Sequence, residues 1–503
     1  MLKLIHSITA LLFPLLLFSQ SYIGFEADNF NGVHGVVSNP ANIADSRTKI
    51  DINLASISAF TTNTYLEIDY TDVLIDDENL LESSNFLGRD DINYGVLNID
   101  VLGPSALITL DEKQSIAITS RLRSITNINN ISGEVIEFFE TEDLLDIEQI
   151  TETNINGSVI NNNWLELGLS YARVLNDNKV HFLKGGISVK YIIGNGSAVA
   201  EIDDGLIAFD PITSGGDVLT LGNARYNFSE NFDLSENFIP FENDDDFDII
   251  SETRGLGFDI GFVYEYRPQH RQNVSRDHVQ KQKKIRHKNT YKYKVGLSIL
   301  DIGSLTYKES LELNGSLNAR TNLNTLLRGN FENEIKTAFN PDEIKVEQKI
   351  LLPTTLRANF DLKLKENFYL NANSILSLHS KNSTNANRLA NQFTISPRYE
   401  TKWLTAFSPI SITQFSGVQW GLGARLGPVF LGSSGAISHF LIDNKTRAID
   451  IYAGIKIPIF HKTPPPPKED DPTSGYESNC NGCVKKDKKE RAKRIQSYRG
   501  GLK

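Results

Sequence analysis

The stretch Arg254–Tyr266, RGLGFDIGFVYEY, decides the fold of this chain. Its even-numbered residues from Leu256 to Tyr266 are all apolar or aromatic, whereas most of its odd-numbered residues are small or charged. A period of two predicts a strand with one apolar face and one small or polar face. At ~3.3 Å per residue the stretch reaches roughly 40 Å, about twice the length of an ordinary soluble strand. Tilted by ~40°, it would cross a hydrocarbon layer of about 30 Å.

The same alternation recurs along much of the chain. It is clearest in Ile50–Phe60, Trp164–Arg173, Leu183–Ile193, Tyr291–Ile299, Leu356–Leu364 and Ile449–Phe460. Repeated long strands with one apolar face predict an all-β fold, an antiparallel transmembrane β-barrel. The strand candidates number about 14, within a range of about 12–16, and we expect an even number because both ends of a bacterial barrel lie on one side of the membrane.

The N-terminus has the pattern of a signal peptide. Met1-Leu-Lys precedes an apolar run, Leu11–Phe18, and the polar pair Ser19-Gln20 follows it. This run is too short to span a membrane, so we expect residues 1–20 to be removed on export, with an N-terminal anchor as the alternative. No run of about 18 apolar residues follows, and only a closed barrel otherwise satisfies the backbone in lipid. We therefore expect an outer-membrane location, with lipid and lipopolysaccharide around the barrel.

The remaining chain divides into three parts. Residues 21–48 form an N-terminal segment with a turn-rich stretch of small residues, and residues 49–460 form the barrel. Residues 461–503 include four consecutive prolines, are rich in charge and contain almost no aliphatic residues. This composition predicts a basic, disordered tail on the periplasmic side.

Composition and motifs argue against several functions. The chain has 503 residues and a net charge of −11, which does not suggest a nucleic-acid binder. No GxxxxGK[ST], GxGxxG, GxSxG or HExxH pattern occurs, and the nine histidines are scattered. We therefore expect no enzymatic activity, no cofactor and no metal site, although a catalytic triad assembled only by geometry would escape this argument.

Two predicted loops leave alternatives open. Gly133–Ile150 has apolar residues near helical spacing among many glutamates, which predicts a short amphipathic helix at the barrel mouth or in the lumen, or else a solvated acidic loop. The acidic run Asp244–Asp248 offers carboxylates for Ca²⁺. Its spacing matches no known calcium loop, so a solvated loop is favoured.

A basic segment, Arg267–Lys288, follows the strand quoted above. Its clustered cations are Lys281, Lys283, Lys284 and Arg286. They would suit a docking surface for a periplasmic protein or for the carboxylates of peptidoglycan, and a merely soluble turn is the alternative.

Tyrosines flank this basic segment. Tyr264 and Tyr266 precede it, and Tyr291 and Tyr293 follow it. Aromatic rings with a polar tip gather at bilayer interfaces, which predicts part of an aromatic girdle. In a soluble sheet the same tyrosines would form a cross-strand cluster.

The two cysteines, Cys480 and Cys483, lie in the charged tail as a CxxC pair. A redox motif needs a βαβ setting and a zinc site needs more ligands, so a local disulfide in an oxidising compartment is favoured. A partner-docking or metal role is the alternative.

The segments Gly35–Ala41, GLGFDIGFVYEYRP, YKVGLSILDIG, LPTTLRANFDLKL and IDIYAGIKIPIF carry a resemblance. Together they resemble an uncharacterised family of outer-membrane barrels of Bacteroidetes type, a domain of unknown function covering most of the mature chain. The motif Asn39-Pro40-Ala41 is also similar to fatty-acid-transporter-like barrels and to barrels that accompany type IX secretion. An N-terminal segment plugs the lumen in those barrels, so the resemblance implies a plug and ligand role for Asn39, Pro40 and Ala41.

Two functional hypotheses follow. A third hypothesis, about the fold itself, would exclude both of them. The first is a channel or carrier for small apolar ligands, in which the glycine-rich inner face leaves space in the lumen. The second is a structural scaffold or secretion accessory that docks a periplasmic partner through the basic turn and tail. An open, partly apolar path would favour the first and a packed lumen the second. A soluble surface β-sandwich would instead have polar outer faces throughout.

Overall fold

The structure, a computed structural model, describes residues 22–69, 84–87, 92–133, 152–208, 218–221, 225–228, 253–268, 274–276, 282–284, 288–314, 319–322, 337, 342–442 and 445–462. The proposed signal peptide, most of Gly133–Ile150, the acidic run Asp244–Asp248 and nearly all of the tail lie outside these residues.

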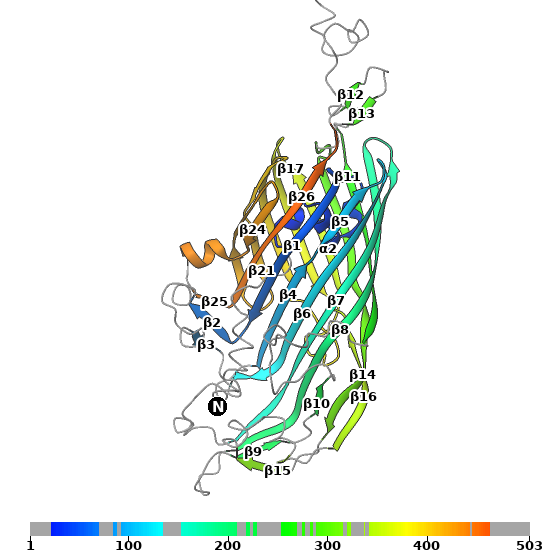
Figure 1. The fold of residues 1–503 in the computed structure, drawn as a ribbon. Coiled ribbons are helices and arrows are strands. Elements are labelled where there is room, and N and C mark those ends of the chain that lie inside the picture. Colours follow the sequence, from blue (N-terminus) through cyan, green and yellow to red (C-terminus); the bar gives the residue numbers. More distant parts are fainter. Residues whose placement is uncertain are drawn as a thin grey trace, which may run out of the picture.

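The described strands form a closed antiparallel ring with fourteen positions, which confirms the predicted barrel (Figure 1). Some positions are shared by two strands in line. In order around the ring they are β1 (Thr48–Asn63), β4 (Ile92–Leu102) with β5 (Ser105–Thr109), β6 (Gln114–Ser132), β7 (Glu152–Asp177), β8 (His181–Ala208), β10 (Arg225–Phe228) with β11 (Arg254–Tyr266), β14 (Tyr293–Asn314), β16 (Asp342–Leu351) with β17 (Thr355–Lys363), β18 (Phe368–Ser377), β19 (Gln392–Glu400), β20 (Leu404–Phe407) with β21 (Ile410–Thr413), β22 (Gly417–Trp420) with β23 (Leu422–Leu426), β24 (Val429–Ser433) and β26 (Ala448–Phe460).

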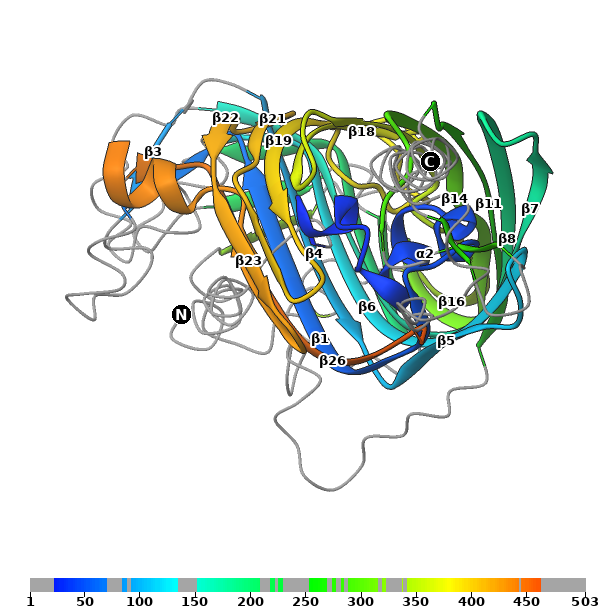
Figure 2. The ribbon, with the colours of Figure 1, turned by 90° about the horizontal axis from the view of Figure 1, so that it is seen from above.

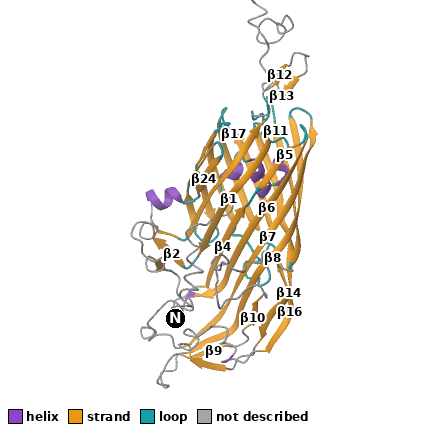
Figure 3. Ribbon diagram, in the orientation of Figure 1, coloured by secondary structure: helices purple, strands orange, loops and turns teal. Residues whose placement is uncertain are grey.

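The remaining elements are short (Figure 3). β9 (Val218–Leu221) pairs with β8 and with β15 (Ala319–Asn322), so these two strands extend the sheet of the ring at one end. Outside the ring lie the hairpin β12 (Val274–Arg276) and β13 (Gln282–Lys284), a small sheet of β25 (Lys445–Thr446), β2 (Leu66–Asp69) and β3 (Ser84–Phe86), and the helical turn η6 (Ser438–Ile442). The N-terminal segment contains η2 (Phe25–Ala27), η3 (Gly32–His34), α2 (Gly35–Ser38) and η4 (Pro40–Ile43). None of the described helices is long and apolar enough to cross a membrane.

The first and last wall strands close the ring. β1 pairs antiparallel with β26, from Thr48 opposite Phe460 to Thr62 opposite Ala448. We call the end of the barrel at Thr48 and Phe460 the terminal end, and the opposite end the loop end. Most connections at the terminal end are short, such as 178–180 and 364–367, whereas several at the loop end are long, such as 64–91 and 315–341. Outer-membrane barrels show this asymmetry, with the short turns on the periplasmic side.

The outer face of the ring is apolar. In β11 the outward residues Leu256, Phe258, Ile260 and Phe262 are all exposed, while inward residues such as Asp259 are buried. The same outward pattern runs through β8, β18, β23 and β26. A continuous exposed apolar wall on a closed barrel needs a lipid surround, so the fold is that of an outer-membrane barrel rather than of a soluble sandwich.

The aromatic cluster at the terminal end differs from the prediction at one residue. Tyr264, Tyr266 and Tyr293 lie on neighbouring strands, and the rings of Tyr266 and Tyr293 stack with centroids 5.2 Å apart. Tyr291, however, is 1% exposed and donates a hydrogen bond from its hydroxyl to Asp361 Oδ2, 2.6 Å away. β14 begins only at Tyr293, so Tyr291 escapes the strand alternation and turns into the barrel.

Predicted strand boundaries were too narrow in the longest hairpin. β7 and β8 run for 26 and 28 residues, far beyond Trp164–Arg173 and Leu183–Ile193. Their loop-side halves contain many asparagines and glycines and therefore lack the apolar alternation that marks a membrane-facing strand. β2 follows β1 closely in the sequence but pairs with β3 and β25 in the small sheet beside the ring.

Candidate functional site

The N-terminal segment 22–47, which we call the plug, lies inside the ring (Figure 2). It is a chain of tight turns. Gly24 and Gly32 adopt φ angles of +84° and +64°, a left-handed conformation that glycine adopts without strain. The Asn39 side chain accepts a hydrogen bond from the backbone N–H of Ala41 at 2.9 Å, which caps η4, and Pro40 supplies its first residue. The Asn-Pro-Ala motif therefore starts a short helical turn against the barrel wall.

Glycines on the inner face let the plug approach the wall closely. A Cβ added to Gly186 would lie 2.5 Å from Ala41 N, and one added to Gly261 would lie 2.1 Å from Asn39 Oδ1. The side-chain amide of Asn39 donates to the carbonyl of Phe262 at 3.2 Å. The expectation that these glycines leave open space was wrong, because the plug occupies that space.

The structure thus brings Asn39, Pro40 and Ala41 together at the contact between plug and wall. Their described contacts are with the protein itself, chiefly the backbone of β8, β11 and β14. A role for them in ligand binding stays a proposal.

Ion pairs between plug acids and wall cations fix the plug from several sides. Asp28 pairs with Arg425 at 2.6 Å, Glu26 with Arg357 at 3.4 Å, and Asp45 with Arg267 at 2.8 Å. All six side chains are at most 9% exposed. A buried charge without its partner is costly, so these pairs favour a single docked position of the plug.

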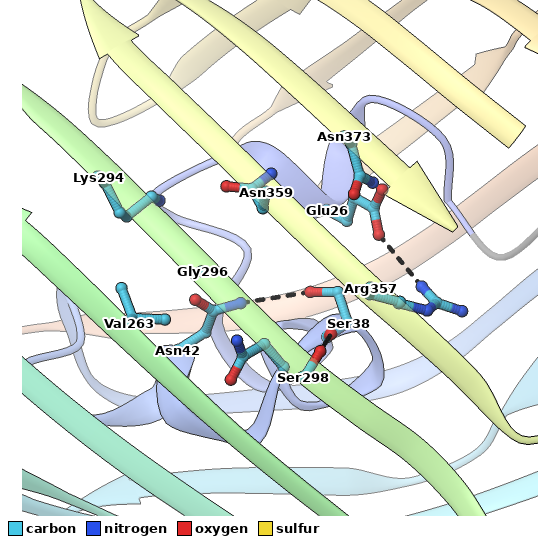
Figure 4. Close-up of a pocket in the computed structure, with 11 residues that line it drawn as sticks. Glu26, Ser38, Asn42, Val263, Lys294, Gly296, Ser298, Arg357, Asn359 and Asn373 are labelled. Atoms are coloured by element: carbon cyan, nitrogen blue, oxygen red, sulfur yellow. Dashed lines mark hydrogen bonds and ion pairs between the residues drawn. The ribbon is translucent and has the colours of Figure 1, made fainter. Parts of the chain in front are cut away.

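A small polar cavity lies between the plug and the wall (Figure 4). Its volume is about 20 Å³, room for about one water molecule. Across it Ser298 donates a hydrogen bond to the carbonyl of Ser38 at 2.8 Å, and Glu26 faces Arg357. A second cavity on the terminal side of the plug has about 30 Å³ and shares Glu26 and Lys294 with the first. Neither cavity can hold a larger solute while the plug is docked.

Glu26 makes plug docking depend on pH. Burial raises the pKa of Glu26 from 4.5 to about 7, although Arg357 acts in the opposite sense. When the plug is released, the pKa of this carboxyl returns to its ordinary value of 4.5. The docked state therefore binds the proton more tightly than the released state, and docking is strongest below about pH 4.5. Docking weakens as the pH rises from there to about 7 and does not change further above that pH. The predicted loss is at most about 3 kcal/mol, since one pKa unit is worth ~1.4 kcal/mol. Thermal unfolding of the wild type and Glu26→Gln from pH 5 to 8 checks this; a constant difference between them would contradict it.

A layer of charged side chains lies on the loop side of the plug. This charge layer consists of Arg123, Glu166, Lys190, Asp259 and Asp301, all buried. Arg123 and Lys190 both pair with Asp301, and Lys190 also pairs with Asp259 at 2.9 Å. Asp301 has a positive φ of 58° at an irregular step between β11 and β14, which aims its carboxylate into the lumen.

An apolar layer follows on the loop side of the charge layer. Its members are buried residues from five wall positions and one loop: Ile125, Ile160, Trp164, Ile192, Val199, Leu305, Tyr307, Ile350, Leu352 and Leu389. Trp164 links the two layers, because its indole N–H donates to Glu166 at 2.8 Å. This layer is larger than the buried apolar clusters that plug residues such as Phe25 and Val33 form with the wall, and it contains no plug residue.

The loop 378–391 between β18 and β19 folds back into the lumen and covers this apolar layer. Asn387 accepts a hydrogen bond from the Asn162 side chain at 2.9 Å, and the Arg388 guanidinium donates to Asn129 at 3.0 Å. These polar contacts position Leu389 in the apolar layer, where it is 1% exposed. Plug, charge layer, apolar layer and loop therefore follow one another along the lumen from the terminal end.

Other predicted site residues cannot be placed in the site. Lys281 and Arg286 lie outside the described residues, as do Cys480 and Cys483. Lys283 and Lys284 belong to β13, in a hairpin beyond the terminal end, but their side chains are not described. Their docking and disulfide roles stay predictions.

The charge layer was missed in the sequence, although a signal for it exists. Asp259 lies on the small-residue face of the first strand quoted, and Lys190 alternates with apolar residues in the same way. A charged residue on the inner face of a membrane strand is a candidate for a lumen ion pair. Which charges meet depends on register, and the sequence alone does not supply it.

Comparison with known proteins gives a family. The profile of a family described as "Family of unknown function (DUF5723)" matches residues 40–434. No curated protein matches the sequence. Among solved structures the chain is similar to the toluene transporter TbuX of Ralstonia pickettii, with 10% identity, a TM-score of 0.40 and coverage of 89% of this chain and 100% of that one. It is also similar to a FadL homologue of Pseudomonas aeruginosa, with 11% identity, a TM-score of 0.37 and coverage of 87% and 97%.

Proposed function

Because the chain belongs to the DUF5723 family, whose description assigns no function, we propose a function from the lumen itself: the protein is a gated outer-membrane carrier for small apolar ligands. The part of the lumen that the structure describes is packed, which taken alone would favour the scaffold. The observation that carries the carrier proposal instead is the apolar layer under the inward-folded loop. A barrel that served only as a scaffold could fill its lumen with the polar pairs found elsewhere in it. A layer of aliphatic and aromatic side chains instead offers the chemistry that a small apolar ligand needs.

In this proposal the loop 378–391 is the outer gate. Leu389 is the loop's contribution to the apolar layer, and the polar side chains beside it hold the loop through exchangeable hydrogen bonds. A ligand that displaced Leu389 would meet Ile125, Trp164 and Ile192 without uncovering a buried charge. Water could take over the hydrogen bonds of Asn387 and Arg388 when the loop lifts, which keeps the cost of opening low.

The plug is the inner gate. It and the charge layer separate the apolar layer from the terminal end, so a bound ligand passes no further until the plug moves. The ion pairs of the plug are buried, and each must exchange its partner for water when the plug is released. We infer that the protein rests in the closed state and that release of the plug is the slower step.

Quenching of Trp164 tests the ligand site. The chain has three tryptophans, of which Trp403 and Trp420 are exposed and Trp164 is buried in the apolar layer. In a W403F/W420F variant in lipid nanodiscs, bromobenzene should quench Trp164 in a saturable manner, because a heavy atom in contact with an indole quenches it.

A variant that keeps only Trp420 is the matched control. Its indole faces outward, so bromobenzene dissolved in the lipid should quench it in proportion to concentration, without saturation. If Trp164 is not quenched, or is quenched only as the lipid-facing Trp420 is, the apolar layer does not bind ligand and the sealed scaffold is the better function.

A further inference from the structure

A cleft of about 440 Å³ opens at the terminal end of the ring, between the plug and the turns of the wall. Five lysines line it, which we call the lysine cleft: Lys288, Lys292, Lys363, Lys365 and Lys402. They come from three separate parts of the chain: the segment before β14, the end of β17 with the turn that follows it, and the turn between β19 and β20. The fold therefore brings together cations that are far apart in the sequence.

The ammonium groups of the cleft differ from those in the lumen. Lys292 donates to the carbonyl of Lys363 at 3.0 Å, and Lys363 donates to the carbonyl of Asn289 at 3.2 Å. Lys402 lies over the ring of Phe460, 4.3 Å from its centroid. Within the part of the chain that the structure describes, none of the five forms an ion pair with a carboxylate. The lumen cations, in contrast, are mostly paired.

The opposite side of the same rim has mixed charge. The turn between β5 and β6 carries Asp111, Glu112 and Lys113, and the turn between β7 and β8 carries Lys179 beside Asp177. The cleft side carries five lysines against two acids, Glu366 and Glu400, so this half of the rim has the more positive potential.

The floor of the cleft is closed and already neutralised. Glu400, one of the two acids that line it, accepts hydrogen bonds from Asn289 at 2.9 Å and from Asn29 of the plug, and it pairs with Arg398 at 2.9 Å. Phe30 and Tyr369 provide an apolar surface beside it. Glu400 is therefore not free to pair with the lysines above it.

We propose that the lysine cleft binds a carboxylate-rich, extended peptide segment of a partner protein that approaches the terminal end. The cleft opens at the terminal end of the ring, between the plug and the turns of the wall, where a soluble segment can enter it. Lysines from three parts of the chain suit carboxylates spaced along a peptide, since each lysine is a separate point charge with flexible reach.

The inference is independent of ligand carriage, because the cleft and the apolar layer lie at different ends of the lumen. It also extends the predicted basic segment Arg267–Lys288, whose last residue, Lys288, lines the cleft. A peptide in the cleft would touch Phe30 and so lie against the plug.

Binding of fluorescent hexaglutamate to the full chain in nanodiscs tests the proposal. At low salt the peptide should bind, and binding should weaken as the ionic strength rises. Lys363→Gln, Lys365→Gln and Lys402→Gln should each weaken it about two- to fivefold, the range for single exposed ion pairs, and the triple variant by about tenfold or more. Lys113→Gln and Lys179→Gln on the mixed side of the rim are the matched controls and should leave the affinity unchanged.

Three results would overturn the proposal. The first is an equal loss of affinity in the control variants, which would mean diffuse attraction to the rim. The second is displacement of the peptide by inorganic phosphate well beyond that by chloride at equal ionic strength, which would indicate a phosphate site. The third is much tighter binding to a chain lacking Lys468–Lys503, which would show that the chain's own acidic residues occupy the cleft. The two experiments are independent. If bromobenzene failed to quench Trp164, the expected binding of hexaglutamate would not change.

Discussion

Replacing Arg425 with alanine should undock the plug and lower the free energy of unfolding by about 3–5 kcal/mol, the cost of leaving one buried charge without its partner. Arg425 Nε donates to Asp28 Oδ2 at 2.6 Å, and the two side chains are 1% and 0% exposed. Burial opposes ionisation of Asp28, yet the pair with Arg425 holds the pKa of Asp28 below its usual value. Without the guanidinium, burial alone remains, and the docked plug must either protonate Asp28 or leave the wall.

A double-mutant cycle separates this effect from the loss of other contacts. Asp28→Asn in the Arg425→Ala background should restore a large part of the loss, because no uncompensated carboxylate remains. Arg173→Ala, which removes an exposed arginine of β7, should change stability by no more than about 0.5 kcal/mol. Chemical unfolding in nanodiscs measures the three single variants Arg425→Ala, Asp28→Asn and Arg173→Ala together with the double variant. Equal losses for Arg425→Ala and the double variant would show that Asp28 does not depend on the pair.

Opening the lumen should require the removal of two seals. The plug closes the terminal side and the loop 378–391 closes the loop side, with the charge and apolar layers between them. Because the seals act in series, deleting residues 22–45 or shortening the loop should each leave the ion conductance near that of the wild type. Deleting both should raise it about tenfold or more, since an emptied barrel of this strand number approaches the width of a porin.

Single-channel recording in planar bilayers measures this conductance. Heat-dependent gel mobility of each variant confirms that the barrel is still closed as a ring. If the plug deletion alone gave the full conductance, the loop would not be a seal, and the proposed outer gate would be wrong.

The barrel wall was predictable because lipid imposes a strict period of two. Arg254–Tyr266 forms β11, with the predicted apolar and polar faces. The last strand, β26, pairs antiparallel with β1, as an even number of strands requires. The loop-side halves of β7 and β8 escaped prediction because no lipid constrains their outer faces. Tyr291 was assigned to the outer face because the alternation was extended back across the start of β14. The alternation holds only within a strand and does not place a residue that precedes it.

The site was less predictable because it depends on which segments meet. Asn39-Pro40-Ala41 was identified from a resemblance, and its position beside Gly186 and Gly261 follows from the fold alone. The inner-face glycines could be identified in the sequence. A glycine is compatible both with an open lumen and with close contact between the wall and another segment, so the sequence could not distinguish the two. The pairing of Asp28 with Arg425 spans almost the whole chain, and no local pattern could have indicated it.

A cross-link between plug and wall tests most directly that the N-terminal segment closes the barrel. The Ser298 hydroxyl contacts the Ser38 carbonyl at 2.8 Å, whereas Ser120 lies on the outer face of β6. In a background with Cys480 and Cys483 replaced by serine, S38C/S298C should form a disulfide in native outer membranes under mild oxidation, and S38C/S120C should not. The disulfide should appear as a mobility shift on non-reducing gels that reductant reverses. Failure of the first pair to cross-link, or equal cross-linking of both, would contradict a plug docked in the lumen.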